Sequence, residues 1–388
     1  MQHSNNDIQT ETYDIHSISF FAMGCHNQVH LELSRIKSLV SAEVMHEHLA
    51  QLEQRILSKL AHWEGIFSRF DGHSELMQLN KRSGEWVAVS QALYEVIQQA
   101  FVFYQQTQGL VTPTVLQSMQ QIGYQSSFET LKKCELNFSC NRSDELNHQQ
   151  NLICSSADNT TPNRSKNSQT PTRPLPLERQ IRLRHKVSTD DGYPTIYEVY
   201  LADGVGIDLN GYVKGWAANK LAKQISTDNR RPLPCLVNLG GDIAVGTVDN
   251  GTVDDIDKVN WTVAIASPNL TDSAKPNSEL SRLKDDVAIF DISTGGVATS
   301  GQDYRRWWHK GKPQHHIINP YDNQSAVSDV LTVTVIAEDA LIAEVCAKYC
   351  LIMGQHSALE WLQDNDIAGL IINTQHQVMT SPAMNNYL

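Results

Sequence analysis

The segments LTVTVI at residues 331–336 and ALIAEVCAKY at residues 340–349 are adjacent and have different patterns. Apolar and polar residues alternate in the first segment, which predicts a β-strand. The second segment contains neither Pro nor Gly and predicts a helix. The chain therefore places a helix directly after a strand near its C-terminal end.

Two longer helices are expected in the N-terminal part of the chain. Residues 43–63 carry apolar side chains at a 4-3-4-4-3 spacing, which is one face of an amphipathic helix. Ser90 is a good N-cap for a second helix, which ends before Gly109. The two helices can cover one face of a sheet. The apolar face of the first helix consists of Met45, Leu49, Leu52, Ile56, Leu60 and Trp63.

Further short strands are expected at residues 236–237, 261–265 and 288–290, and a polar hairpin tip is expected at residues 271–284. These strands and the helices follow one another in no regular βαβ order. The predicted fold class is therefore α+β.

The length of 388 residues allows two or three domains, or one large domain that carries long insertions. Residues 141–172 contain few large apolar side chains and cannot offset their ordering entropy by burial. We expect a mobile polar insertion at about 134–177 and a disordered N-terminal tail at 1–17. The remainder of residues 18–388 is expected to form one domain.

The composition excludes several classes of function. The formal net charge is −12 and the basic residues form no patch, so a nucleic-acid partner is not expected. The apolar runs are too short for a transmembrane helix, and the N-terminus shows no export signal, so a cytoplasmic location is expected. The seven Cys residues show no CxxC spacing, which argues against a zinc site and a disulfide framework.

Polar and Gly-containing clusters lie at turns between the apolar segments. Residues 208–215 contain an Asn-Gly turn that enters a helix with Lys214 in its first turn, a combination that suits an anion. Gly240 and Gly241 could let a ligand approach the backbone. Each cluster taken alone also fits an ordinary turn, and no Walker or GxGxxG pattern is present. These patterns alone indicate an α+β protein with a possible anion site.

The order of the clusters carries more information than any one of them. It resembles the ApbE family of FAD:protein FMN transferases over residues 20–355. The matching motifs are Met23-Gly24, Phe67 to Asp71, Ser74 to Leu76, Asn80, Gly109 to Val115, Gly123-Tyr124, Asp208 to Gly215, Asn238 to Asp242, Thr299 to Gly301, and His316 to Pro320.

The resemblance implies a single ApbE-like domain, related to the T-fold, with antiparallel sheets covered by helices. It also implies a transferase that cleaves FAD at its pyrophosphate and attaches FMN to a Ser or Thr of a target protein, a post-translational flavinylation that releases AMP. The implied partner is a redox protein with an FMN-binding domain. Mg²⁺ normally assists this reaction.

The resemblance assigns roles to individual residues. The implied catalytic residues are Lys348, Glu344 and His316. The implied FAD contacts are Met23, Phe70, Leu110, Val111, Thr112, Asp208, Lys214, Gly240, Gly241, Ser300 and Ile318. The implied metal ligands are the backbone carbonyl of Gly211 and the carboxylate of Glu344.

The chain departs from the family pattern at three places. The family usually has Phe-Asp where this chain has Val111-Thr112, and Asp where it has Asn319. Where the family has Asp and Thr as magnesium ligands, this chain has Glu344 and Lys348. Lys supplies no oxygen ligand, so the usual magnesium site cannot be assembled unchanged.

Glu344 and Lys348 are four residues apart in the favourable order for a helical ion pair. One interpretation is an exposed surface pair, worth a few tenths of a kcal/mol. The other is that Lys348 places a positive charge beside a pyrophosphate while Glu344 holds it there.

Three functions remain open at this point. The first is an active FMN transferase. The second is an FAD-binding carrier, sensor or scaffold that has lost transfer. The third is a pyrophosphatase that hydrolyses FAD to FMN and AMP.

Overall fold

The computed structural model describes residues 13–37, 39–128, 130–131, 175–186, 195–249, 256–257, 259–268 and 286–388. Most of the predicted insertion, up to residue 174, lies outside the described residues, and so does the predicted hairpin tip at 271–284.

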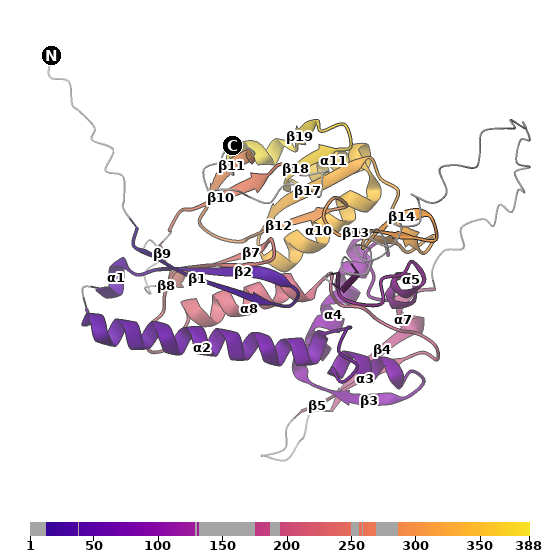
Figure 1. Ribbon diagram of the computed structural model, residues 1–388, viewed down its shortest axis with the longest axis horizontal. Helices are drawn as coiled ribbons and strands as arrows, with labels where there is room; N and C mark the ends of the chain where they lie inside the picture. The colour runs from indigo at the N-terminus through magenta and orange to yellow at the C-terminus, as the bar shows by residue number, and fades with distance from the viewer. Residues whose placement is uncertain are drawn as a thin grey trace, which may run out of the picture.

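One antiparallel sheet of eight strands, in the order β1-β2-β6-β7-β12-β17-β18-β19, joins both ends of the chain (Figure 1). Neighbouring strands pair in antiparallel register throughout. The single domain over residues 18–388 stays a prediction. The strands are β1 (Ile15–Ala22), β2 (Cys25–Glu32), β6 (Cys235–Leu239), β7 (Asp242–Gly246), β12 (Gly296–Gly301), β17 (Val330–Ala337), β18 (Ala368–Asn373) and β19 (Val378–Thr380).

Helices cover one face of this sheet. Helix α8 (Val213–Ser226) packs on β6 and β7, and α10 (Ala340–Met353) packs on β12 and β17. Helix α2 (Ala42–Phe67) runs alongside α8, where Trp63 meets Trp216 with ring centroids 5.0 Å apart (Figure 1). The helices and the sheet thus enclose the main apolar core between them.

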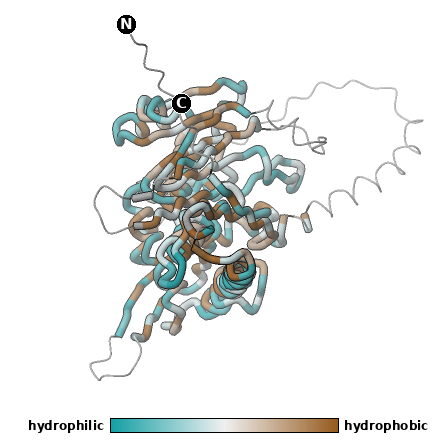
Figure 2. Tube along the Cα trace, turned by 90° about the vertical axis from the view of Figure 1, so that its left-hand side faces the viewer, coloured by the Kyte–Doolittle hydropathy of each residue, from teal (hydrophilic) through white to brown (hydrophobic). Residues whose placement is uncertain are grey.

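The opposite face of the sheet is covered by a hairpin of β10 (Trp261–Ala266) and β11 (Asp286–Ile292). Successive side chains of a strand point to opposite faces. Accordingly, Val237 belongs to the core under α8, whereas Leu236 belongs to the core under the hairpin. Figure 2 shows hydrophobic positions interspersed with hydrophilic ones along the packed elements, as expected where each element buries one face.

A smaller antiparallel sheet, in the order β3-β5-β4, lies beside α3 and α4 at the lower edge of Figure 1. Its strands are β3 (Trp86–Val89), β4 (Ile181–Lys186) and β5 (Ile196–Leu201). The remaining helices are α1 (Ser34–Lys37), α3 (Glu75–Lys81), α4 (Gln91–Gln106), α5 (Leu116–Gln121), α7 (Leu177–Gln180), α11 (Gln355–Asp364) and the 3-10 helix η1 (Pro382–Asn386). The remaining strands are β8 (Val248–Asp249), β9 (Ile256–Asp257), β13 (Arg306–His309), β14 (Lys312–His315), β15 (Ile318–Asn319) and β16 (Gln324–Ser325).

The expected helices and strands are present, and the α+β class is confirmed. The Ser90 hydroxyl caps α4 by accepting a hydrogen bond from the backbone N–H of Leu93. Two boundaries need correction. Strand β1 begins at Ile15 and pairs with β2 over its whole length, so the predicted tail at 1–17 is three residues too long. Leu177 is fully buried in the core, so the folded chain resumes before the predicted insertion ends.

Helices α8 and α10 approach each other closely at Gly215. A Cβ atom at Gly215 would lie 2.7 Å from the carbonyl oxygen of Ala340 and 2.7 Å from the Cα of Leu341. Both are backbone atoms, which cannot rotate away. The close contact of the two helices therefore depends on glycine at this position.

We expect Gly215→Ala to lower the free energy of unfolding by about 1–3 kcal/mol, because the added methyl group forces the two helices apart. Urea denaturation followed by circular dichroism measures this change. The matched control is Gly65→Ala at an exposed position of helix α2, where an added Cβ meets no atom within 4 Å. That change should be neutral or stabilise by up to about 1 kcal/mol. Equal effects at the two sites would contradict the packing argument.

Candidate functional site

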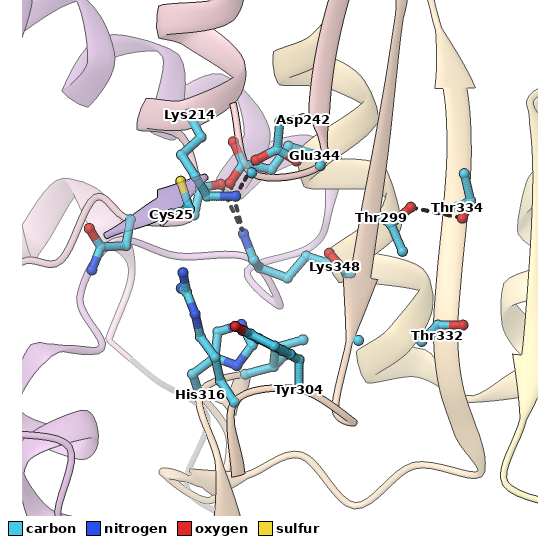
Figure 3. Close-up of a pocket in the computed structure, with 18 of the residues that line it drawn as sticks. Cys25, Lys214, Asp242, Thr299, Tyr304, His316, Thr332, Thr334, Glu344 and Lys348 are labelled. Carbon is cyan, nitrogen blue, oxygen red and sulfur yellow. Dashed lines mark hydrogen bonds and ion pairs between the residues drawn. The ribbon is translucent and has the colours of Figure 1, made fainter. Parts of the chain in front are cut away.

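A cavity of about 710 Å³ opens where the ends of the large sheet, the start of α8 and helix α10 meet. Its walls come from segments far apart in the sequence, including the turn after β1, the loop before α8, the β6–β7 turn, β12, β17 and residues 303–305. Figure 3 shows a cluster of charged side chains from α8, β7 and α10, with His316 and Tyr304 across from them.

The loop before α8 is held by a buried ion pair. Arg69 Nε lies 3.0 Å from Asp208 Oδ2, and both side chains are almost fully buried. The guanidinium packs against the rings of both Phe70 and Tyr124, each centroid 4.1 Å from Cζ, and these two rings contact each other edge to face. The other oxygen of Asp208 accepts a hydrogen bond from the backbone N–H of Asn210. The ion pair therefore fixes the backbone that leads into α8.

Lys214, in the first turn of α8, forms an ion pair with Asp242 at the start of β7. Asp242 is 2 % exposed, so its charge is compensated within the protein. Burial lowers the pKa of Lys214, but the carboxylates of Asp242 and Glu344 outweigh this effect and raise it. Lys214 is therefore a charged and firmly held residue of the cavity wall.

Glu344 and Lys348 of α10 both point into this cluster, and the interpretation as an exposed surface pair is wrong. Their side chains are 5 % and 18 % exposed, and Lys348 Nζ lies 3.9 Å from Glu344 Oε1. The other carboxylate oxygen of Glu344 accepts the backbone N–H of Gly215 at 3.0 Å. Lys348 Nζ donates to the carbonyl oxygen of Gly211 at 2.9 Å. The helix contact at Gly215 buries this face of α10, which sequence spacing alone does not show.

The two adjacent histidines have different environments. His315 is buried and its Nε2 bonds to the carbonyl oxygen of Ala326 at 2.9 Å, which is a structural contact. His316 lines the cavity, and its buried Nδ1 has no hydrogen-bond partner among the residues that the structure describes. Burial lowers the pKa of His316 well below its usual value, and the positive charges of Arg305 and Lys348 add to the effect. His316 is therefore a neutral imidazole near pH 7.

Most of the predicted site residues line the cavity. They are Leu110, Val111, Thr112, Asp208, Gly211, Lys214, Gly240, Gly241, Ser300, His316, Ile318, Glu344 and Lys348. Their individual roles stay predictions.

Two predicted FAD contacts, Met23 and Phe70, are not among the lining residues. Met23 sits in the β1–β2 turn with φ 53° and packs against the main core, while its neighbours Gly24 and Cys25 face the cavity. Phe70 is 41 % exposed and stacks on Arg69.

Several lining residues were not predicted as site residues. Asp242 directly follows the Gly-Gly pair and could have been found as a partner for Lys214. Arg305 is half-buried in the cavity wall and makes no ion pair or hydrogen bond with the described residues. Tyr304, beside it, is 73 % exposed at the cavity. Thr299 and Thr334 bond to each other across β12 and β17 at 2.8 Å (Figure 3). Thr299 belongs to the matching motif at residues 299–301, whereas Thr334 has no sequence signal beyond the strand pattern.

The residues present do not fit a magnesium site of the usual kind. The Gly211 carbonyl, one of the two predicted ligands, already accepts a hydrogen bond from the Lys348 ammonium. The positive charge of the Lys348 ammonium would repel a metal ion placed beside it. In addition, Mg²⁺ needs about six oxygen ligands in octahedral geometry. Within the described part of the chain, no three His, Cys, Asp or Glu side chains are grouped to hold a metal ion.

Comparison with known proteins identifies relatives. The ApbE family pattern matches residues 23–371. The chain is 28 % identical over 188 residues to the FAD:protein FMN transferase of Treponema pallidum, covering 48 % of each protein. It is 24 % identical over 199 residues to that of Haemophilus influenzae, covering 51 % of this chain and 49 % of the relative. The aligned segment thus spans about half the length of these curated relatives.

Solved structures match over nearly the whole chain. The ApbE protein of Thermotoga maritima superimposes with a TM-score of 0.65 at 20 % identity, covering 96 % of this chain and 99 % of that one. The flavin transferase ApbE of Vibrio cholerae gives a TM-score of 0.60 at 17 % identity, covering 97 % and 100 %. At these identities the likeness establishes the fold alone.

The buried Arg69–Asp208 pair generates a stability prediction. Asp208→Asn leaves the guanidinium buried without its counter-charge, so we expect the free energy of unfolding to fall by about 3–5 kcal/mol. The control is Glu85→Gln, which breaks an exposed pair with Arg82 and should cost at most about 1 kcal/mol. Urea denaturation measures both changes. A loss for Asp208→Asn as small as the control would show that the buried pair does not hold the loop.

Proposed function

The chain belongs to the ApbE family, and we propose that it is an FAD:protein FMN transferase. The observation that carries the proposal is a cavity lined by Lys214, Lys348, Arg305 and His316, whose Nδ1 has no partner among the described residues. The volume of about 710 Å³ suits a ligand of dinucleotide size. Clustered cations in one cavity suit a pyrophosphate.

In the proposed reaction, the hydroxyl oxygen of a target Ser or Thr attacks the phosphorus on the FMN side of the FAD pyrophosphate. A new P–O bond forms to the target, and the bond from that phosphorus to the bridging oxygen breaks. The bridging oxygen leaves with AMP, and the hydroxyl proton passes to a base. Positioning and charge stabilisation supply most of the catalysis in reactions of this type.

His316 is the proposed base. It lines the cavity as a neutral imidazole, and no group among the described residues forms a hydrogen bond with its Nδ1. A neutral imidazole can take the hydroxyl proton as the new bond forms. Asp208, Gly240 and Ile318 line the same cavity and are proposed to contact the FAD.

The partner is proposed to be a redox protein with an FMN-binding domain, because it must present a Ser or Thr hydroxyl to the cavity. Within the described residues, no helix is long and apolar enough to cross a membrane. The cytoplasmic location stays a prediction. Mg²⁺ stays a predicted cofactor, and the Gly211 carbonyl, one of its predicted ligands, accepts a hydrogen bond from Lys348.

The alternative functions keep one specific observation in their favour. The replacement of a metal ligand by Lys348 could mark a protein that binds FAD without transferring FMN. Hydrolysis of FAD to FMN and AMP would need only a water molecule in place of the target hydroxyl.

Incubation of the purified chain with FAD and an FMN-binding target domain tests transfer. We expect a fluorescent target band that survives denaturing electrophoresis, together with one AMP per FMN attached. The matched control is a target in which the acceptor Ser or Thr is replaced by Ala. AMP release without a labelled band would indicate the pyrophosphatase, and FAD binding without AMP release would indicate the carrier.

The pH profile of AMP release tests His316. Because its pKa is lowered, the imidazole stays neutral below pH 6.5, and we expect the rate to hold until the pH falls through the lowered value. Burial is the main cause, and the charges of Arg305, His315, Lys348 and Lys214 contribute. Arg305→Gln removes one of these charges, so His316 regains a proton more easily.

The acid limb of the profile should therefore move to higher pH in Arg305→Gln. Arg306→Gln is the matched control, because Arg306 is exposed and does not line the cavity. His316→Ala should lower the rate by about 10²–10⁴-fold and abolish the acid limb. An acid limb that persists in His316→Ala would exclude His316 as the titrating base.

A further inference from the structure

We propose that the ammonium of Lys348, with Arg305 as a second cation, supplies the positive charge for the FAD pyrophosphate, so that this chain works without a divalent metal. The proposal rests on the proposed function, because it concerns the substrate of the same cavity. Under this proposal Lys348 is a catalytic residue, and the Gly211 carbonyl holds the Lys348 ammonium in position.

The position of the ammonium is fixed from two sides. Nζ donates to the Gly211 carbonyl at 2.9 Å, and the Glu344 carboxylate lies 3.9 Å away. Glu344 is itself held by the backbone N–H of Gly215. The contact is tight, because a Cβ at Gly211 would lie 2.3 Å from Nζ. The side chain is thus built into the cavity wall.

The ammonium still has donors to offer. A Lys ammonium carries three N–H groups, and within the described part of the chain one of them is used, on Gly211. The separation of 3.9 Å from Glu344 is an ion pair but exceeds hydrogen-bond distance. Lys348 lines the cavity and is 18 % exposed, so the remaining N–H groups can reach a bound anion.

Lys214 does not provide an equivalent group. Its ammonium is in direct contact with the buried Asp242 carboxylate, so a pair of opposite charges faces the ligand there. Asp208 is likewise neutralised by Arg69. The ammonium of Lys348 lies 3.9 Å from the Glu344 carboxylate, so it can bind an anion from its fixed position without breaking an ion pair at contact distance.

Arg305 supplies the second charge. It lines the cavity, is half-buried, and forms no ion pair or hydrogen bond with any residue that the structure describes. Its positive charge lowers the pKa of His316 and opposes the rise in the pKa of Lys214, and the charge of Lys348 also lowers the pKa of His316. Arg305 and Lys348 therefore share neighbours in one cavity. Together they place two cationic groups in one cavity, of which Lys348 is paired with Glu344, and an Arg can bind two phosphate oxygens at once.

The proposed role concerns the leaving group. When the bond between the FMN phosphorus and the bridging oxygen breaks, negative charge develops on that oxygen as AMP departs. Fixed cations beside it stabilise this charge. The proton of the target hydroxyl goes to His316, so neither step needs a metal-bound group.

Two measurements test the proposal without requiring transfer. The first is FAD binding, followed by flavin fluorescence, in EDTA. We expect the wild-type chain to bind FAD equally well in EDTA and in MgCl₂. Lys348→Met should bind FAD at least about 10-fold more weakly, because a charge-assisted contact to the pyrophosphate is lost. Arg305→Gln should also weaken binding, whereas the exposed-pair control Lys220→Met should not.

The second measurement uses Mn²⁺ as a spectroscopic probe of metal binding. The FAD-loaded wild type should bind no Mn²⁺ beyond what free FAD binds. Lys348→Thr frees the Gly211 carbonyl, leaves Glu344 and adds a hydroxyl oxygen, so it offers oxygen ligands in place of an ammonium. This variant should bind Mn²⁺. Circular dichroism shows whether each variant is folded, and Lys348→Met serves as the folded variant without added oxygen.

Activity then adds a third readout. Wild-type AMP release should be unchanged by EDTA, while Lys348→Thr should lose activity in EDTA and regain it in MgCl₂. Mn²⁺ binding by the wild type, loss of FAD binding in EDTA, or unchanged binding by Lys348→Met would overturn the proposal. If the binding results hold but AMP is never released, the cation site stands and the proposed transferase function fails.

Discussion

The hydrogen bond from the backbone N–H of Gly215 to the Glu344 carboxylate joins the two helices that build the site. It exists because glycine lets α8 and α10 approach to backbone contact. Glu344 in turn lies beside Lys348, one turn further along α10, and Lys348 reaches back to the Gly211 carbonyl just before α8. One close contact between the two helices thus fixes both the start of α8 and the positions of Glu344 and Lys348 on α10.

Burying a charge costs free energy unless an opposite charge compensates it, and the charges of this cavity are compensated in pairs. Arg69 offsets Asp208, Lys214 offsets Asp242, and Lys348 lies beside Glu344. These ion pairs hold the charged side chains in place before a ligand binds. Such preorganisation is the condition for electrostatic stabilisation of a reaction. Arg305 lies outside this pairing among the described residues, which leaves one net positive group for an anionic ligand.

The elements were predictable from sequence because periodicity is a local property. The alternation at 331–336 became β17, and Ser90 capped α4 as expected. The site was predictable as a set of segments, since their order matched a family. The burial of Lys348 was not predictable from the sequence. It depends on the packing of α8 against α10, and these helices are more than a hundred residues apart in the sequence. The stacking of Phe70 on Arg69, away from the cavity, depends on tertiary contacts in the same way.

Strand β2, the second strand from one edge of the large sheet, lies beside β6, with Leu31 opposite Cys235. Residues about 200 positions apart must meet before this pair can form, and contacts of such long range form slowly. The cavity also needs α10, close to the C-terminal end. During synthesis, the sheet therefore stays incomplete until β17 and β18 have emerged, and the cavity is complete only after Lys348 of α10 has joined the fold.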